Sequence, residues 1–189
     1  MKPIPRMRFF FRAAFCYSLI LLLSSALPLI HAGEVEGKSS EKTFGQPAAP
    51  DFTLRTMDGE PFTLSKNLHK GPIILHFWAT WCLPCMAEMK AMKTALEARK
   101  QTNLQVLSVS VDDNKTSAKV KGHVRARKYP FTILMDDEKK VYDAFQVANC
   151  PQLFLLDKDG SIVYSHTGFT NGDEKQLMAR LDALDAPEK

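Results

Sequence analysis

The segment HFWATWCLPC, residues 76–85, constrains the possible folds of this chain more than any other part of the sequence. Residues 71–80 form a nearly continuous apolar run, which predicts a strand buried on both faces. Residues 82–100 continue at helical spacing, and one face of that helix carries Cys85, Met89, Met92 and Leu96. A Cys-x-x-Cys pair is therefore expected where a buried strand turns into a helix.

This placement gives the two cysteines different chemistry. Cys82 is expected at the helix N-terminus, where free backbone N–H groups and the helix dipole favour a negative charge. The pKa of its thiol is lowered there, which makes Cys82 the nucleophile. Cys85 lies one turn later and is positioned to attack a mixed disulfide at Cys82 and release the partner. Pro84 is tolerated because it falls in the first helical turn.

Two structural alternatives compete with this redox interpretation. A zinc site would need a second pair of ligands, and the sequence has no other Cys-x-x-Cys or close Cys/His pair. A purely structural disulfide between residues three apart closes a very small loop and stabilises little. The redox interpretation is favoured, with the Cys82–Cys85 disulfide as the redox-active group and no dissociable cofactor.

The rest of the sequence predicts a mixed sheet with helices around it. Further strands are predicted at 104–111 and 131–135, and helices at 114–129, 138–147 and 172–185. One hairpin is predicted around Asp58-Gly59, and another joins residues 152–157 to 161–166 through a Lys-Asp-Gly turn. Strands that alternate with helices and end in a hairpin indicate an α/β fold with a mixed central sheet flanked by helices.

The N-terminal residues have a different composition from the remainder. Residues 1–32 combine four basic residues with an apolar run and contain no acid, which predicts a signal peptide or a membrane anchor, with residues 9–30 as the tether. Residues 33–46 predict a flexible polar linker. The remaining basic and acidic residues number 21 each, so a neutral domain is left at 47–189 and nucleic-acid binding is not expected. The domain is expected outside the cytoplasm, in the periplasm or another extracytoplasmic space.

The segment FWATWCLPCMAEM, residues 77–89, resembles the active-site segment of the thioredoxin superfamily, and most closely that of its extracytoplasmic TlpA/ResA-like branch. The resemblance extends over residues 47–185. It implies a thioredoxin fold with an N-terminal β-hairpin extension and a central insertion before Pro151. It also implies that Pro151 is a cis proline facing the two cysteines.

The same resemblance implies a function. Members of this branch are thiol–disulfide oxidoreductases that reduce disulfides of partner proteins, in cytochrome c maturation, copper-centre assembly and similar tasks. Protein dithiols and disulfides are therefore the expected partners, together with an upstream reductant in the membrane. Trp81, Pro84, Cys150 and Pro151 are expected to line the surface that receives the partner.

The chain departs from the family pattern at three positions. His76 stands where thioredoxins have Asp and many TlpA-like proteins have Asn. Lys90 replaces a proline that commonly kinks the active-site helix. Cys150, directly before the expected cis proline, replaces a residue that is commonly Thr, Val or another small residue.

Glu88 and His76 are the candidate groups for handling protons. Glu88, three residues after Cys85, is expected on the same side of the helix, either as a carboxylate that tunes the thiols or as a solvated first-turn acid. The register of His76 places it under Cys85, either as the base for that thiol or as a hydrogen-bonded core residue.

Cys150 leaves several interpretations open. It is a small apolar filler, a third redox-active thiol, or a metal ligand. The last interpretation gives the main alternative function, a Cu(I)-handling protein that uses Cys82, Cys85 and Cys150 as a thiolate site. A thiol peroxidase is a weaker alternative, because Ala79 stands three residues before Cys82 where the peroxidatic segments have Thr or Ser.

Overall fold

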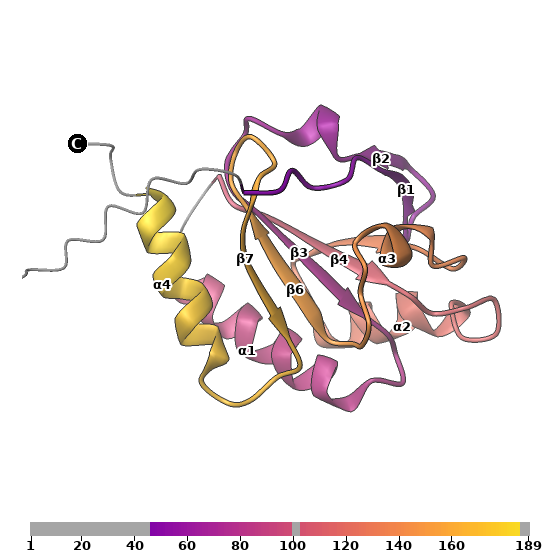
Figure 1. The fold of residues 1–189 in the computed structure, drawn as a ribbon. Coiled ribbons are helices and arrows are strands. Elements are labelled where there is room, and N and C mark those ends of the chain that lie inside the picture. The colour runs from indigo at the N-terminus through magenta and orange to yellow at the C-terminus, as the bar shows by residue number, and fades with distance from the viewer. Residues whose placement is uncertain (1–45, 100–102, 186–189) are drawn as a thin grey trace, which may run out of the picture. The chain divides into compact units, whose positions relative to one another are not determined.

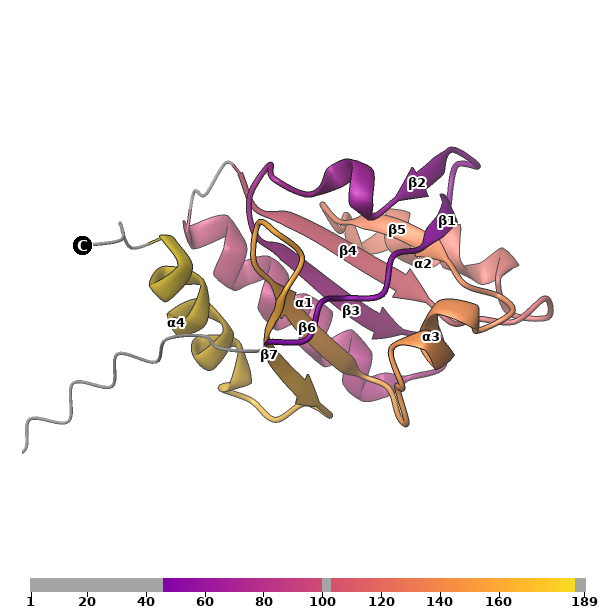
Figure 2. The same cartoon turned by 45° about the horizontal axis from the view of Figure 1, so that its top comes forward.

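The structure is a computed structural model that describes residues 46–99 and 103–185. Its centre is one seven-stranded sheet in the order β2-β1-β5-β4-β3-β6-β7 (Figures 1 and 2). The strands are β1 (Thr53–Thr56), β2 (Pro61–Thr63), β3 (Ile73–Trp78), β4 (Gln105–Ser110), β5 (Thr132–Met135), β6 (Gln152–Leu156) and β7 (Ile162–Thr167). A short 3-10 helix, η1 (Ser65–Asn67), follows β2.

The sheet is mixed, as the sequence predicts. β3 pairs in parallel with β4, and β4 with β5, whereas β6 and β7 join antiparallel beside β3. The N-terminal hairpin of β1 and β2 adds antiparallel strands at the β5 edge. All six residues of β3 are buried because this strand lies in the interior of the sheet with packed elements on both faces. The thioredoxin fold with its N-terminal hairpin is confirmed.

Alternating side chains of β3 show which helices cover which face. Trp78 contacts His123 of α2 (Ala118–Arg127), on the face that also carries α1 (Leu83–Arg99). Phe77 points to the opposite face, where its ring meets Tyr142 of α3 (Lys140–Ala144). The C-terminal helix α4 (Asp173–Asp185) lies beside α1 (Figure 1). The α1 and α4 pair therefore covers the part of the sheet from which the cysteines emerge.

Two predicted helices are shorter than the sequence indicates. α2 begins at Ala118 rather than residue 114, because the Asp113 carboxylate accepts hydrogen bonds from the N–H groups of Lys115 and Thr116 and holds them in a turn. α3 covers only Lys140–Ala144, because Asp136 caps its first turn and a left-handed Gln146 follows its end. α1 runs through Lys90 without a break.

The predicted targeting segment, residues 1–32, lies outside the described residues, as does the predicted linker 33–46 except for Gln46. Among the residues that the structure describes, no helix is both long and apolar enough to span a membrane.

Candidate functional site

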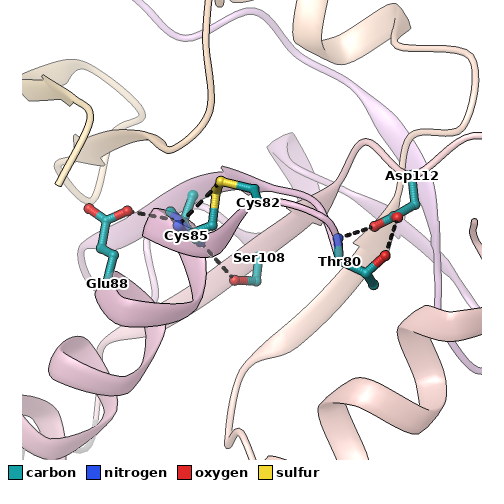
Figure 3. The surroundings of a disulfide bond; sticks show 7 residues. Thr80, Cys82, Cys85, Glu88, Ser108 and Asp112 are labelled. Carbon is teal, nitrogen blue, oxygen red and sulfur yellow. Dashed lines mark hydrogen bonds and ion pairs between the residues drawn. A yellow bond between two sulfur atoms is a disulfide. The ribbon is translucent and has the colours of Figure 1, made fainter.

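The two cysteines of the motif form a disulfide at the start of α1. Their Cα atoms are 5.3 Å apart, and both residues are buried, Cys85 completely. The backbone N–H of Cys85 donates a hydrogen bond to Sγ of Cys82 at 3.2 Å (Figure 3). Because α1 begins at Leu83, Cys82 occupies the capping position, and its sulfur accepts from an N–H that has no partner inside the helix. The predicted placement of both cysteines is confirmed.

A buried carboxylate that the sequence analysis missed holds the loop before Cys82. Asp112 accepts hydrogen bonds from the backbone N–H of Thr80 at 2.8 Å and from the Thr80 hydroxyl at 2.6 Å (Figure 3). It also accepts one from the Ser110 hydroxyl at 2.9 Å. Asp112 is fully buried. The position of Asp112 in the sequence could have indicated this role. Asp112 follows a strand that runs parallel to the strand before the cysteines, and such strands end at the same edge of a sheet.

His76 and Glu88 meet in the interior near the disulfide. Nε2 of the fully buried His76 lies 2.9 Å from Oε2 of Glu88, and its Nδ1 lies 3.2 Å from the hydroxyl of Ser108. The imidazole–carboxylate contact is close, but its direction is not that of a good hydrogen bond. Glu88 is 5% exposed, so it is not a solvated first-turn acid. Ser108 is a further site residue that the sequence analysis missed.

Cys150 precedes a cis peptide bond to Pro151, as the family resemblance implies. Its thiol is free and half-buried. Burial, opposed by the nearby charge of Lys139, raises the pKa of Cys150 to about 11. At neutral pH Cys150 is therefore almost entirely a neutral thiol, which disfavours a nucleophilic role.

Two large apolar side chains flank Cys82 at the surface. Trp81 is 61% exposed and Leu83 is 81% exposed, and the adjoining Pro84 is exposed as well. Leu83 was not singled out from the sequence, because an apolar residue between two cysteines carries no periodic signal. Exposed apolar groups beside a buried disulfide offer a contact surface for another protein.

The described part of the chain contains no group of three or more His, Cys, Asp or Glu side chains placed to hold a metal ion. In this oxidised state the sulfurs of Cys82 and Cys85 are bonded to each other. The geometry thus adds no support to a Cu(I) site that includes Cys150.

Comparisons with known proteins agree with this site. The model of the AhpC/TSA family matches residues 45–165. The thiol-disulfide oxidoreductase ResA of Geobacillus kaustophilus is 35% identical over 120 residues, which cover 64% of this chain and 67% of that protein. ResA of Bacillus thuringiensis is 30% identical over 153 residues, 80% of this chain and 86% of that protein.

A solved structure shares the fold. The crystal structure of a putative thiol:disulfide interchange protein DsbE from Chlorobium tepidum superposes with a TM-score of 0.66 and 26% identity. The match covers 75% of this chain and 97% of that one. The similarity therefore extends over nearly the whole length of that chain.

Proposed function

The chain belongs to the AhpC/TSA family and is a thioredoxin-like thiol–disulfide oxidoreductase similar to ResA, and from this premise we propose that it reduces disulfides of partner proteins outside the cytoplasm. The observation that carries the proposal is the Cys82–Cys85 disulfide at the first turn of α1, with the Cys85 N–H directed at Sγ of Cys82. In the reduced protein the same N–H stabilises a Cys82 thiolate.

The reaction begins with the reduced pair. The Cys82 thiolate attacks one sulfur of the partner disulfide, the partner S–S bond breaks, and one partner sulfur leaves as a thiolate. Cys85 then loses its proton and attacks Sγ of Cys82. The Cys82–Cys85 bond forms and the second partner sulfur leaves, so two electrons have passed from the pair to the partner. In this reaction the Cys82–Cys85 disulfide is the oxidised end state of the pair.

The proton of Cys85 needs an acceptor, and we assign this role to the His76–Glu88 pair. His76 is buried with Ser108 and Glu88 as its polar partners, and Glu88 follows Cys85 by three residues on α1. An imidazole in contact with a carboxylate can serve as a general base. The carboxylate then stabilises the imidazolium that forms.

The partner is proposed to dock over Trp81 and Leu83, with Pro84 beside them. The backbone around Cys150 and Pro151 is proposed to pair with the partner's chain. The resemblance to the TlpA/ResA-like branch supports protein disulfides of cytochrome c maturation or copper-centre assembly as substrates. It also supports a membrane reductant that regenerates the thiols.

The proposed location can be tested with the N-terminal residues alone. If residues 1–32 are a signal peptide or anchor and 33–46 a linker to the domain at 47–189, then residues 1–45 fused to a reporter active only after export give an active reporter. The four basic residues followed by an apolar run are the physical reason. A reporter that stays inactive and cytoplasmic contradicts the proposed location.

The direction of electron flow is tested by the reduction potential of the Cys82–Cys85 couple. A reductant is expected to have a value near that of thioredoxin, about −270 mV, whereas a strong oxidant lies near about −120 mV. The measurement equilibrates the full-length protein with glutathione or dithiothreitol buffers and quantifies the disulfide by mass spectrometry. A value close to that of the strong oxidant would overturn the proposed reducing role.

A further inference from the structure

A row of polar side chains crosses the sheet beneath α1 and α4. The strand register aligns Ser108 of β4 with His76 of β3, His76 with Leu153 of β6, and Leu153 with His166 of β7. Residues aligned across neighbouring strands point to the same face. His166 therefore lies two strands from His76 on the same face, about 10 Å away at the usual strand spacing. Only Leu153 interrupts the polar row.

A small cavity lies between Glu88 and His166, the outer end of this row. Its lining includes Glu88 from α1, Leu153 from β6, Tyr164 and His166 from β7, and Asp173 and Glu174 from α4. Met92, Phe169 and Leu177 complete the lining, and the volume open to water is about 10 Å³, the lower limit for one water molecule. Glu88 therefore contacts His76 on one side and faces this cavity on the other, which provides a route past Leu153.

The outer end of the cavity carries a second histidine–carboxylate pair. Nε2 of His166 lies 3.3 Å from Oδ2 of Asp173, and the two side chains are 22% and 20% exposed. The Nε2 atom itself is buried and, like Oε2 of Glu88, has no well-directed hydrogen bond to the described residues. Burial and then the charge of Asp173 raise the pKa of Tyr164, Arg180 opposes them, and the charge of Glu88 makes a smaller contribution that raises it. The charges of Asp173 and Glu88 thus both raise the pKa of the Tyr164 hydroxyl, which lies beside the cavity.

We propose that His166 and Asp173 form the outlet through which the proton of Cys85 reaches solvent after the His76–Glu88 pair has taken it up. The inference rests on the proposed function and adds to it a proton pathway. The proton passes from the Cys85 thiol to His76 and Glu88, then through a water in the cavity to His166, and leaves at the exposed edge. Electrons move only between sulfur atoms, and the outlet carries one proton for each disulfide reduced.

The charged and titratable groups around this route come from four elements. His76 lies on β3, Glu88 on α1, and Tyr164 with His166 on β7, while α4 contributes Asp173, Glu174 and Arg180, whose guanidinium lies 5.7 Å from the centre of the Tyr164 ring. Asp173 is the carboxylate in contact with His166, and the one cation in this set, Arg180, lies over the Tyr164 ring.

The test separates first attack from resolution in the full-length chain. Cys16→Ser and Cys150→Val leave two of the four cysteines, Cys82 and Cys85. The reduced protein is mixed with dithiobis(nitrobenzoate), whose first coloured thiolate reports attack by Cys82 and whose second reports resolution by Cys85. We expect His166→Ala to slow the second release about tenfold and to leave the first unchanged, a smaller effect than loss of a direct proton acceptor.

Chemical rescue with imidazole, and a second histidine–aspartate pair as a control, make the test specific. Added imidazole is expected to restore the second release in His166→Ala, because it replaces the missing proton carrier. His69→Ala is the control: His69 lies 3.1 Å from Asp159 in another histidine–aspartate pair, which is exposed and does not line the cavity. Asp173→Asn should slow the second release in the same direction as His166→Ala.

The outcomes distinguish this inference from the proposed function. Unchanged second release in both His166→Ala and Asp173→Asn, with normal release in the parent protein, overturns the outlet alone. A slowed release that imidazole does not restore, or an equal slowing in His69→Ala, also overturns it. Failure of the parent protein to release any second thiolate contradicts the proposed function instead.

Discussion

Replacing Cys82 by serine is expected to abolish reduction of protein disulfides, by at least about a thousandfold, because the nucleophile that forms the mixed disulfide is lost. Cys85→Ser should behave differently. It retains a Cys82 thiolate stabilised by the N–H of residue 85, so it attacks partners but cannot release them. Partners should therefore accumulate as mixed disulfides on Cys85→Ser and not on Cys82→Ser. Non-reducing electrophoresis of extracts, followed by mass spectrometry, measures the difference.

The control for this comparison is Cys150→Ser. Cys150 is a free thiol close to the cis proline, but burial holds its pKa at about 11, so it should not capture partners at neutral pH. Reduction of insulin disulfides by Cys150→Ser should remain close to that of the parent protein. Equal trapping by the Cys82→Ser and Cys85→Ser variants would contradict the assignment of attack and resolution to these two residues.

Local patterns in the sequence were sufficient to predict where the two cysteines lie in the fold. The apolar run of β3 followed by helical spacing placed Cys82 and Cys85 at a strand–helix junction, because both signals lie within a few residues of the cysteines. His76 and Glu88 were each predicted to lie near Cys85, whereas their contact with each other was found only in the structure. The roles of these residues in proton transfer remain predictions.

Contacts between distant residues explain what the sequence did not reveal. Asp112 and Thr80 are 32 residues apart and meet only because β3 and β4 pair in parallel. His166 reaches the row of polar side chains only through the register of β6 and β7. The starts of α2 and α3 were misplaced for another reason: the Asp113 and Asp136 side chains bind backbone N–H groups, a competition that hydrophobic periodicity does not detect.

Asp112→Ala is expected to lower the free energy of unfolding by about 3 kcal/mol, the second large effect we predict. The substitution removes the acceptor of three hydrogen bonds, and the donors at Thr80 and Ser110 remain in or beside the protein interior without it. A buried donor left unpaired costs about 1–3 kcal/mol. Urea unfolding of the reduced and the oxidised protein measures the loss.

Asp112→Ala should also disturb the active site, because Thr80 lies two residues before Cys82. With the loop no longer held by Asp112, the cap formed by Sγ of Cys82 on the N–H of Cys85 should weaken, and attack by Cys82 should slow. Asp113→Ala is the matched control, since the neighbouring carboxylate is exposed and accepts bonds only within its own turn. It should lose less stability and keep the parent rate of attack. If both variants lost the same stability and reacted equally fast, the Asp112 hydrogen bonds would contribute neither to folding nor to the position of Cys82.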